Sequence, residues 1–256
     1  MRKRFCGRVN KILEYNIEEF GNIRSRIGML SVANAGITEN DMFSMRPRGV
    51  FLHFTRIAME KEINISNLAN KTQSIDEALS TLMPGREDIK IICYNCTSGS
   101  LILGEEKIIN QIENKYPHVK GTTMLTGVIK ALRTINANKI SIGTAYTEDI
   151  NIMEQEFFEK KGFHVLKIEG LSLVTDKEMN EVSSQELLNF IISLDDPNAE
   201  AIFISCGGLR VTEIIETAES LIKKPIITSN QASFWNCLRL AEIDDNITQF
   251  GKLFKY

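Results

Sequence analysis

The chain has 256 residues, of which 43% are hydrophobic and 25% charged, as in an ordinary globular protein. Its formal net charge of −3 gives no reason to expect a nucleic acid or an anionic membrane as partner. No apolar run approaches the roughly 20 residues that cross a bilayer, and no apolar segment follows the basic residues 1–4 as in a secretory signal. We therefore expect a cytoplasmic protein.

Apolar runs alternate with helical patterns along the chain, so we predict an α/β fold in which βαβ units build parallel sheets. Residues 1–25 are mixed and charged and are predicted to be a helical or irregular extension. The predicted strands span residues 27–31, 50–54, 90–94, 139–144, 164–168, 201–205 and 225–229. The predicted helices span residues 74–83, 105–115, 124–135, 149–161, 184–194, 212–222 and 234–242. The first of these helices is expected to begin with a capping box from Ser74 to Glu77.

Two cysteines follow predicted strands at comparable places in the two halves of the chain. Cys96 ends one apolar run and precedes the small residues Thr-Ser-Gly-Ser, while Cys206 ends another and precedes Gly207 and Gly208. The carboxyl ends of parallel strands are where open α/β sheets bind their ligands. Two thiols placed in this way can face one small molecule from opposite sides, which favours proton-transfer chemistry.

Hydrogen-bond donors near these cysteines are the next candidates. Removing a proton or CO₂ beside a carboxylate builds negative charge on it, which donors aimed at that charge stabilise. Thr97, Ser98 and the backbone N–H groups of the two glycines after Cys206 can supply such donors. Thr97 and Ser98 have a plainer alternative as N-cap residues of the next helix. Arg56 and Arg210 are candidates to pair with a carboxylate, or are solvated surface residues.

A redox protein is an alternative from another class, because Cys93 and Cys96 have CxxC spacing. In redox proteins the first cysteine of such a pair opens the helix, whereas Cys93 lies inside a predicted strand. A non-catalytic binding protein is a further alternative. No second cysteine pair or histidine pair has ligand spacing, so no metal site is predicted.

Three segments carry a resemblance to known enzymes. Residues 94–100 (YNCTSGS) look like the first cysteine motif of maleate cis-trans isomerases. Residues 205–209 (SCGGL) are similar to the second cysteine motif of arylmalonate decarboxylases, and residues 143–147 (GTAYT) resemble a shared segment whose tyrosine, here Tyr146, binds the substrate carboxylate. The chain thus resembles the aspartate/glutamate racemase superfamily, in its maleate isomerase and arylmalonate decarboxylase branch, over about residues 27–240.

The resemblance implies an α/β fold of two similar Rossmann-like lobes, each with a parallel four-stranded sheet. The lobes would be related by a pseudo-twofold axis, with the active site between them and no cofactor. We assign residues 26–120 and 230–256 to the first lobe, residues 121–229 to the second, and residues 1–25 to an N-terminal extension. The sequence leaves open whether the chain forms a homo-oligomer.

The resemblance also implies roles for individual residues. Cys206 would act as acid/base or proton donor, and Cys96 as its partner on the opposite face or as a nucleophile. Maleate isomerases carry an asparagine in the first loop, and this chain has Asn34 one position away. The candidate substrate-binding residues are therefore Thr97, Ser98, Tyr146, Asn34, Gly207 and Gly208.

The departures from these relatives favour one reaction over the others. The decarboxylases have glycine at the position of Cys96, which favours isomerisation or racemisation in this chain. The motifs of amino-acid racemases are absent, so an amino-acid substrate is disfavoured. We expect a cofactor-independent isomerase, either a maleate-type cis-trans isomerase or a racemase, that acts on a small dicarboxylate through two opposed cysteines. An arylmalonate-type decarboxylase with Cys206 as proton donor is the alternative.

Overall fold

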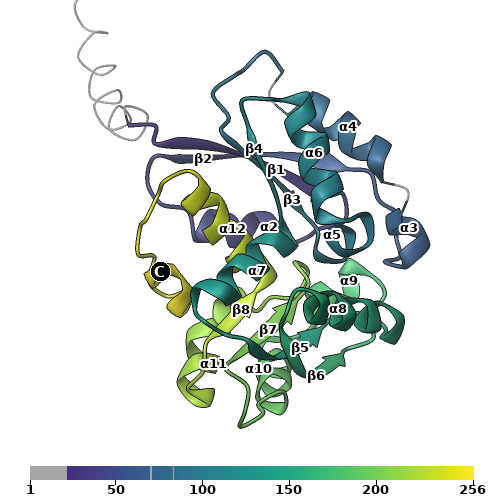
Figure 1. Ribbon diagram of the computed structural model, residues 1–256, viewed down its shortest axis with the longest axis vertical. Coiled ribbons are helices and arrows are strands. Elements are labelled where there is room, and N and C mark those ends of the chain that lie inside the picture. Colours follow the sequence, from purple (N-terminus) through teal and green to yellow (C-terminus); the bar gives the residue numbers. More distant parts are fainter. Residues whose placement is uncertain (1–21, 70, 83) are drawn as a thin grey trace, which may run out of the picture.

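The computed structural model describes residues 22–69, 71–82 and 84–256, which form two α/β units stacked along the long axis of the molecule (Figure 1). Each unit contains a four-stranded sheet, with strand order β2-β1-β3-β4 in the first and β6-β5-β7-β8 in the second. All strand pairs are parallel. Both sheets therefore place their strands in the order second, first, third, fourth, which confirms the predicted α/β fold with two similar parallel sheets.

The strands are long and buried at the centre of each sheet. The strands are β1 (Ser25–Val32), β2 (Val50–Ile57), β3 (Ile91–Asn95), β4 (Lys120–Thr123), β5 (Lys139–Thr144), β6 (His164–Gly170), β7 (Ala201–Ser205) and β8 (Ile226–Thr228). Every residue of β3 and β7 is buried. Continuous burial is typical of parallel strands that helices cover on both faces, and it explains why their sequences are unbroken apolar runs.

Helices connect the strands and cover both sheets. They are α2 (Thr38–Ser44), α3 (Ile65–Ala69), α4 (Thr72–Thr81), α5 (Thr97–Leu103), α6 (Glu105–Lys115), α7 (Met124–Thr134), α8 (Glu148–Lys160), α9 (Asp176–Glu181), α10 (Ser184–Ser193), α11 (Ile215–Ile222) and α12 (Ser229–Leu240), with short 3₁₀ turns η1 (Thr212–Ile214) and η2 (Lys252–Lys255). The expected capping box at Ser74 is wrong, because α4 begins at Thr72 with Lys71 as its N-cap. Lys71 is buried and its ammonium pairs with Glu60 at 2.5 Å, so a tertiary contact fixes this helix start.

The two units meet through the helices that follow their fourth strands. Helix α7 follows β4 and α12 follows β8, and the two helices pack against each other between the sheets (Figure 1). Gly127 permits their close approach, since a Cβ there would lie 2.8 Å from the Ala232 carbonyl oxygen and 2.9 Å from the Cα of Ser233. Helix α12 also contacts β3, so it links the second sheet to the core of the first.

The expected N-terminal extension lies outside the described residues up to residue 21. Its last residues join the first unit, because Arg24 pairs with Asp245 and Ser25 begins β1. The residue limits assigned to the two lobes remain a prediction. No described helix combines the length and apolar character that a bilayer span requires.

We expect Gly127→Ala to lower the free energy of unfolding by about 1–2 kcal/mol. Overpacking between buried helices costs about 1–3 kcal/mol, which exceeds the roughly 1 kcal/mol that alanine gains over glycine in helix propensity. Urea unfolding followed by circular dichroism measures the difference. Lys130→Ala, at an exposed position of the same helix, is the control and should change stability by less than about 0.5 kcal/mol. A stabilised Gly127→Ala protein would contradict the tight α7–α12 contact.

Candidate active site

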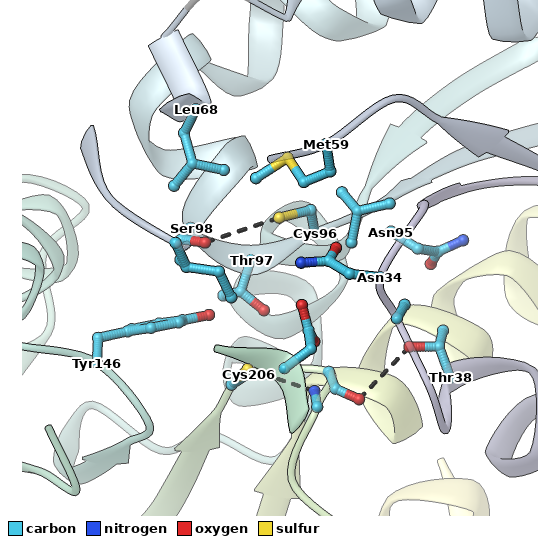
Figure 2. A pocket seen from close by; sticks show the side chains of 16 residues that line it. Asn34, Thr38, Met59, Leu68, Asn95, Cys96, Thr97, Ser98, Tyr146 and Cys206 are labelled. Carbon is cyan, nitrogen blue, oxygen red and sulfur yellow. Dashed lines mark hydrogen bonds between the residues drawn. The ribbon is translucent and has the colours of Figure 1, made fainter. Parts of the chain in front are cut away.

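The two cysteines occupy equivalent places in the two sheets. Cys96 directly follows β3 and Cys206 directly follows β7, the third strand of each sheet. Asn34 and Tyr146 lie two residues beyond β1 and β5, the first strand of each sheet. All four side chains line one cavity, whose empty space is about 380 Å³ when the open solvent at its mouth is included, with Cys96 and Cys206 on opposite sides of it (Figure 2). The shared strand order therefore brings two pairs of equivalent residues together.

The cavity has a polar and an apolar part. All residues predicted from the sequence to form the site line it: Cys96, Cys206, Thr97, Ser98, Tyr146, Asn34, Gly207 and Gly208. The apolar lining residues are Val32, Ala35, Met59, Ile63 and Leu68. Met59 and Leu68 lie on the Cys96 side of the cavity (Figure 2). Thr38, Asn95 and Asp176 also line the cavity and were not predicted.

Cys96 is the N-cap residue of α5. Its sulfur accepts a hydrogen bond from the Gly99 N–H at 3.2 Å and lies 3.7 Å from the Ser98 hydroxyl oxygen. The alternative that Thr97 or Ser98 caps this helix is therefore wrong. Burial raises the pKa of the Cys96 thiol, and the Gly99 and Ser98 hydrogen bonds oppose that rise. These two donors limit the rise, but the pKa of the Cys96 thiol stays above its ordinary value.

Cys206 has a different setting. Its φ angle is +118°, which is a strained region for any residue with a side chain. Its sulfur accepts a hydrogen bond from the Gly208 N–H at 3.3 Å and lies 3.5 Å from the Met179 sulfur. Burial, together with the nearby Asp176 carboxylate, raises the pKa of the Cys206 thiol to about 12. Cys206 is therefore a protonated thiol at neutral pH.

Gly207 and Gly208 act mainly through their small size and their backbone groups. A Cβ at Gly207 would lie 3.0 Å from the Asn230 amide oxygen, and one at Gly208 would lie 3.1 Å from Asp176 Oδ1. The Gly208 N–H, expected from the sequence to donate to a substrate carboxylate, donates to Cys206 instead. The Gly207 carbonyl accepts a hydrogen bond from Asn230 at 3.0 Å.

Ser229 connects the two cysteine loops. Its hydroxyl oxygen accepts hydrogen bonds from the Cys206 N–H at 3.1 Å and from the Thr97 hydroxyl at 2.9 Å. The Thr97 hydroxyl, expected to hold the substrate, is therefore engaged with protein. The N–H groups of Thr97 and Ser98, in the first turn of α5, have no helical acceptor. Ser229 was not predicted, and its position directly after β8, equivalent to that of Met124 after β4, was the available signal.

A buried carboxylate joins the two units beside the cavity. Asp41 of α2 accepts hydrogen bonds from Thr212 and from Asn230, each at 2.7 Å. Both donors come from the second half of the chain, whereas α2 follows the first strand of the first sheet. This network holds the loop after β1 against the loop after Cys206.

Asn34 and Tyr146 present polar groups to the cavity. Both amide atoms of Asn34 are buried and have no hydrogen-bond partner within the described part of the chain. The Tyr146 side chain points across the cavity toward Cys206 (Figure 2). Burial first, and then the neighbouring cysteine and Glu154 charges, raise the pKa of Tyr146 well above its ordinary value, so its hydroxyl is a donor. These two side chains are available to bind a ligand.

Asp176 is the ionisable lining residue that the sequence did not reveal. It is the first residue of α9, it is buried, and its Oδ2 atom has no hydrogen-bond partner in residues 22–69, 71–82 and 84–256. Burial raises the pKa of this carboxyl to about 6. The two arginine candidates lie elsewhere, since Arg56 pairs with Glu39 at 2.8 Å and Arg210 with Glu213 at 3.1 Å.

The geometry gives no support to a redox cysteine pair. Cys93 lies inside β3, is fully buried and does not line the cavity, and its sulfur lies 3.2 Å from the Ser233 hydroxyl oxygen. Cys93 and Cys96 are both free thiols. Across the described residues, no three His, Cys, Asp or Glu side chains gather as metal ligands would.

A family model described as arylmalonate decarboxylase matches residues 67–254, which include both cysteine loops. The chain belongs to this family. The match confirms the predicted membership in the maleate isomerase and arylmalonate decarboxylase branch of the aspartate/glutamate racemase superfamily. Arylmalonate decarboxylase from Bordetella bronchiseptica is 28% identical over 122 residues, which cover 47% of this chain and 51% of that enzyme. The chain thus spans about half the length of this curated relative.

Solved structures of the family share the fold. A Nocardia farcinica maleate cis-trans isomerase mutant with a covalently bound succinylcysteine intermediate has a TM-score of 0.84 at 17% identity, covering 90% of this chain and 98% of that one. A liganded arylmalonate decarboxylase mutant, in which one glycine is replaced by cysteine and one cysteine by serine, has a TM-score of 0.82 at 21% identity, covering 90% and 99%. Both likenesses extend over the two α/β units.

We expect Asp176→Asn to stabilise the protein more at pH 7.5 than at pH 4. The folded-state pKa of about 6 exceeds the value of 3.8 for an aspartate in an unfolded chain, so the stability that protonated Asp176 contributes is present below pH 4 and is lost as pH rises through 6. The stability difference between variant and wild type should therefore grow by about 2–3 kcal/mol over this range. Urea unfolding at both pH values measures it. Asp149→Asn, an exposed residue in the first turn of α8, is the control. A difference that does not vary with pH would contradict the burial of an unpaired carboxyl.

Proposed function

We propose that this protein is a cofactor-independent isomerase that converts a small unsaturated dicarboxylate of the maleate type into its trans isomer. The observation that carries this proposal is that two thiols, from equivalent strand ends of two sheets, line opposite sides of one small cavity. An enzyme that only protonates a carbanion needs one thiol. A second thiol on the opposite face supports chemistry in which a nucleophile and an acid act on adjacent carbons.

The two cysteines have surroundings that suit different roles. Cys96 caps a helix and accepts hydrogen bonds from Gly99 and Ser98, so it is the better nucleophile. Cys206 holds its proton at neutral pH and is the better acid. The Cys96 thiol first gives its proton to solvent. The resulting thiolate adds to one alkene carbon, and a C–S bond forms as the π bond breaks. The electron pair moves to the adjacent carbon, where it is delocalised into the carboxylate as an enediolate, and the Cys206 thiol protonates that carbon.

The adduct then has a single bond between the two former alkene carbons. Rotation about this bond brings the two carboxylates to the trans arrangement. The Cys206 thiolate removes the proton that it donated, the double bond forms again, and the Cys96 thiolate leaves. Both cysteines return to their starting states and no other reactant is consumed. The succinylcysteine bound in the Nocardia maleate isomerase mutant supports an adduct of this kind.

The substrate carboxylates require donors on both sides of the cavity. Asn34 has two unpartnered amide atoms, and Tyr146 extends its protonated hydroxyl into the cavity. The Ser98 hydroxyl and the free N–H groups at the start of α5 lie beside Cys96. We propose that Thr97 contributes its N–H, while its hydroxyl keeps the Ser229 contact. These donors stabilise the charge that builds on the carboxylate in the enediolate.

Two other reactions use the same groups. Racemisation would have one thiolate remove an α-proton and the opposite thiol return it. Decarboxylation of a malonate-type acid would need only Cys206 as proton donor, and the apolar side chains of Val32, Met59, Ile63 and Leu68 favour a substrate with an apolar substituent. Decarboxylation is therefore the second candidate.

Nuclear magnetic resonance in D₂O separates the three reactions when the protein is incubated with maleate, a 2-aryl-2-methylmalonate and a chiral 2-aryl acid. We expect the wild type to form fumarate from maleate. Cys96→Ser and Cys206→Ser should each lower the rate at least about 1000-fold, because loss of a catalytic nucleophile or base has effects of that order. CO₂ loss from the malonate, retained in Cys96→Ser, would establish the decarboxylase instead.

The Cys206→Ser protein incubated with maleate should retain the mass of one substrate on Cys96. Without the Cys206 thiolate, the adduct cannot efficiently lose its proton and accumulates. Intact-mass spectrometry and peptide mapping detect and place it. Cys93→Ser, a buried cysteine outside the cavity, is the matched control and should keep activity within a few-fold. Full activity of both Cys96→Ser and Cys206→Ser would contradict the two-thiol mechanism.

A further inference from the structure

The mechanism leaves one carboxyl group of the cavity unused. Asp176 lines the cavity together with both cysteines, and only 7% of its surface is exposed. Its Oδ1 atom lies close to Gly208, whereas its Oδ2 atom is buried and has no partner in the described part of the chain. A buried carboxyl oxygen without a partner costs free energy unless a ligand or a proton satisfies it.

Within the described part of the chain, no cationic side chain lines the cavity to balance this group. None of the lining residues is lysine, arginine or histidine. A dianionic ligand, a Cys96 thiolate and an ionised Asp176 would place several negative charges in one buried space with nothing opposing them. Like charges at such separations in a poorly solvated site repel strongly. The ligand and the thiolate are required by the proposed reaction, so Asp176 is the group that must be neutral.

The groups that face Asp176 come from several elements. Cys96 and Cys206 approach from the ends of β3 and β7, and the ionised carboxylate raises the pKa of both thiols. Tyr146 and Asn34 line the same cavity as Asp176. On its other side Asp176 borders a groove, whose charged residues are Lys61 of the β2–α3 connection and, on α9 itself, Lys177 and Glu181.

The lysines of that groove interact with carboxylates other than Asp176. The Lys177 ammonium lies 3.7 Å from a carboxylate oxygen of Glu181. The charge of Lys61 contributes to the lowered pKa of Glu178 on α9. No ion pair among the described residues includes Asp176. Burial is the cause of the raised pKa of Asp176. The protonation of this carboxyl is therefore governed by what occupies the cavity.

We infer that Asp176 is a substrate-positioning residue that works as a carboxylic acid, donating its O–H to one carboxylate of the bound diacid. This inference rests on the proposed function for the class of ligand. At neutral pH the carboxyl takes its proton from solvent as the ligand binds, and no bond to carbon changes. The Asp176 O–H then donates a hydrogen bond to the ligand carboxylate. It takes the place of the lysine or arginine donor that binds a carboxylate in many other sites.

Two consequences follow for binding. Each diacid bound at neutral pH should take up one proton, and its affinity should fall about tenfold per pH unit above pH 7, as linkage to one proton requires. The neutral carboxyl also ceases to raise the pKa of the two thiols, which partly offsets the negative charge that the bound diacid adds beside them. An amide at position 176 can donate a hydrogen bond without a proton from solvent.

Isothermal titration calorimetry with succinate, a saturated diacid that cannot isomerise, tests the inference on the full chain. Titrations at pH 7.5 in phosphate and in Tris give the number of protons taken up, because the two buffers differ in ionisation enthalpy. We expect about one proton per succinate for the wild type and for the exposed control Asp149→Asn. We expect none for Asp176→Asn, whose Kd should also stay constant between pH 7 and pH 8 while that of the wild type rises about tenfold.

Each other outcome contradicts the inference. Succinate binding without proton uptake by the wild type, an unchanged pH slope in Asp176→Asn, or no succinate binding at millimolar concentration would overturn it. Tighter binding of aspartate than of succinate, without proton uptake, would show that Asp176 acts as a carboxylate toward an ammonium group. The proposed function is tested separately. If the protein takes up a proton with succinate but isomerises no diacid, the inference about Asp176 holds and the proposed isomerase activity is wrong.

Discussion

The site depends on one shared hydrogen-bond acceptor, the hydroxyl oxygen of Ser229. It accepts from the Cys206 N–H, directly after β7, and from the Thr97 hydroxyl, directly after the Cys96 cap of α5. A single atom thus fixes both cysteine loops, although they come from different sheets. Each such bond contributes only about 1 kcal/mol, but a buried N–H without an acceptor costs more. The Asp41 network beside it holds the loop after β1 against the loop after Cys206.

The fold is nearly symmetric and the chemistry is not. Equal strand orders bring Cys96 and Cys206 to matching positions, with Asn34 and Tyr146 as the matching pair from the first strands. The local backbone then separates the two thiols. Cys96 begins a helix from an extended conformation and is surrounded by donors, whereas Cys206 has a φ of +118° and a pKa raised to about 12 by its burial and the Asp176 charge. The two thiols therefore differ in their surroundings, which is the basis of the proposed division into a nucleophile and an acid.

The sequence predicted the sheets and the thiols because their signals are local. Buried parallel strands are continuous apolar runs, and a cysteine before small residues marks the end of such a run, as at Cys96 and Cys206. The short elements α2, α3, α9 and β4 were missed because too few residues show a period. Asp176 was not identified as a site residue because its place beside the cysteines comes from neighbours far away in the chain, whereas Ser229 had a signal in its position directly after β8. The start of α4 was misplaced because the tertiary pairing of Lys71 overrides a local capping pattern.

The backbone at the two cysteines also sets which reactions can arise from this scaffold by mutation. Position 96 has φ of −153°, an extended conformation that every amino acid adopts, so its side chain can be exchanged without backbone cost. Position 206 has φ of +118°, where most replacements add strain, and a Cβ on the nearby Gly208 would make a tight contact of 3.1 Å with Asp176 Oδ1. Position 96 therefore accepts a different side chain at a lower backbone cost than position 206 does.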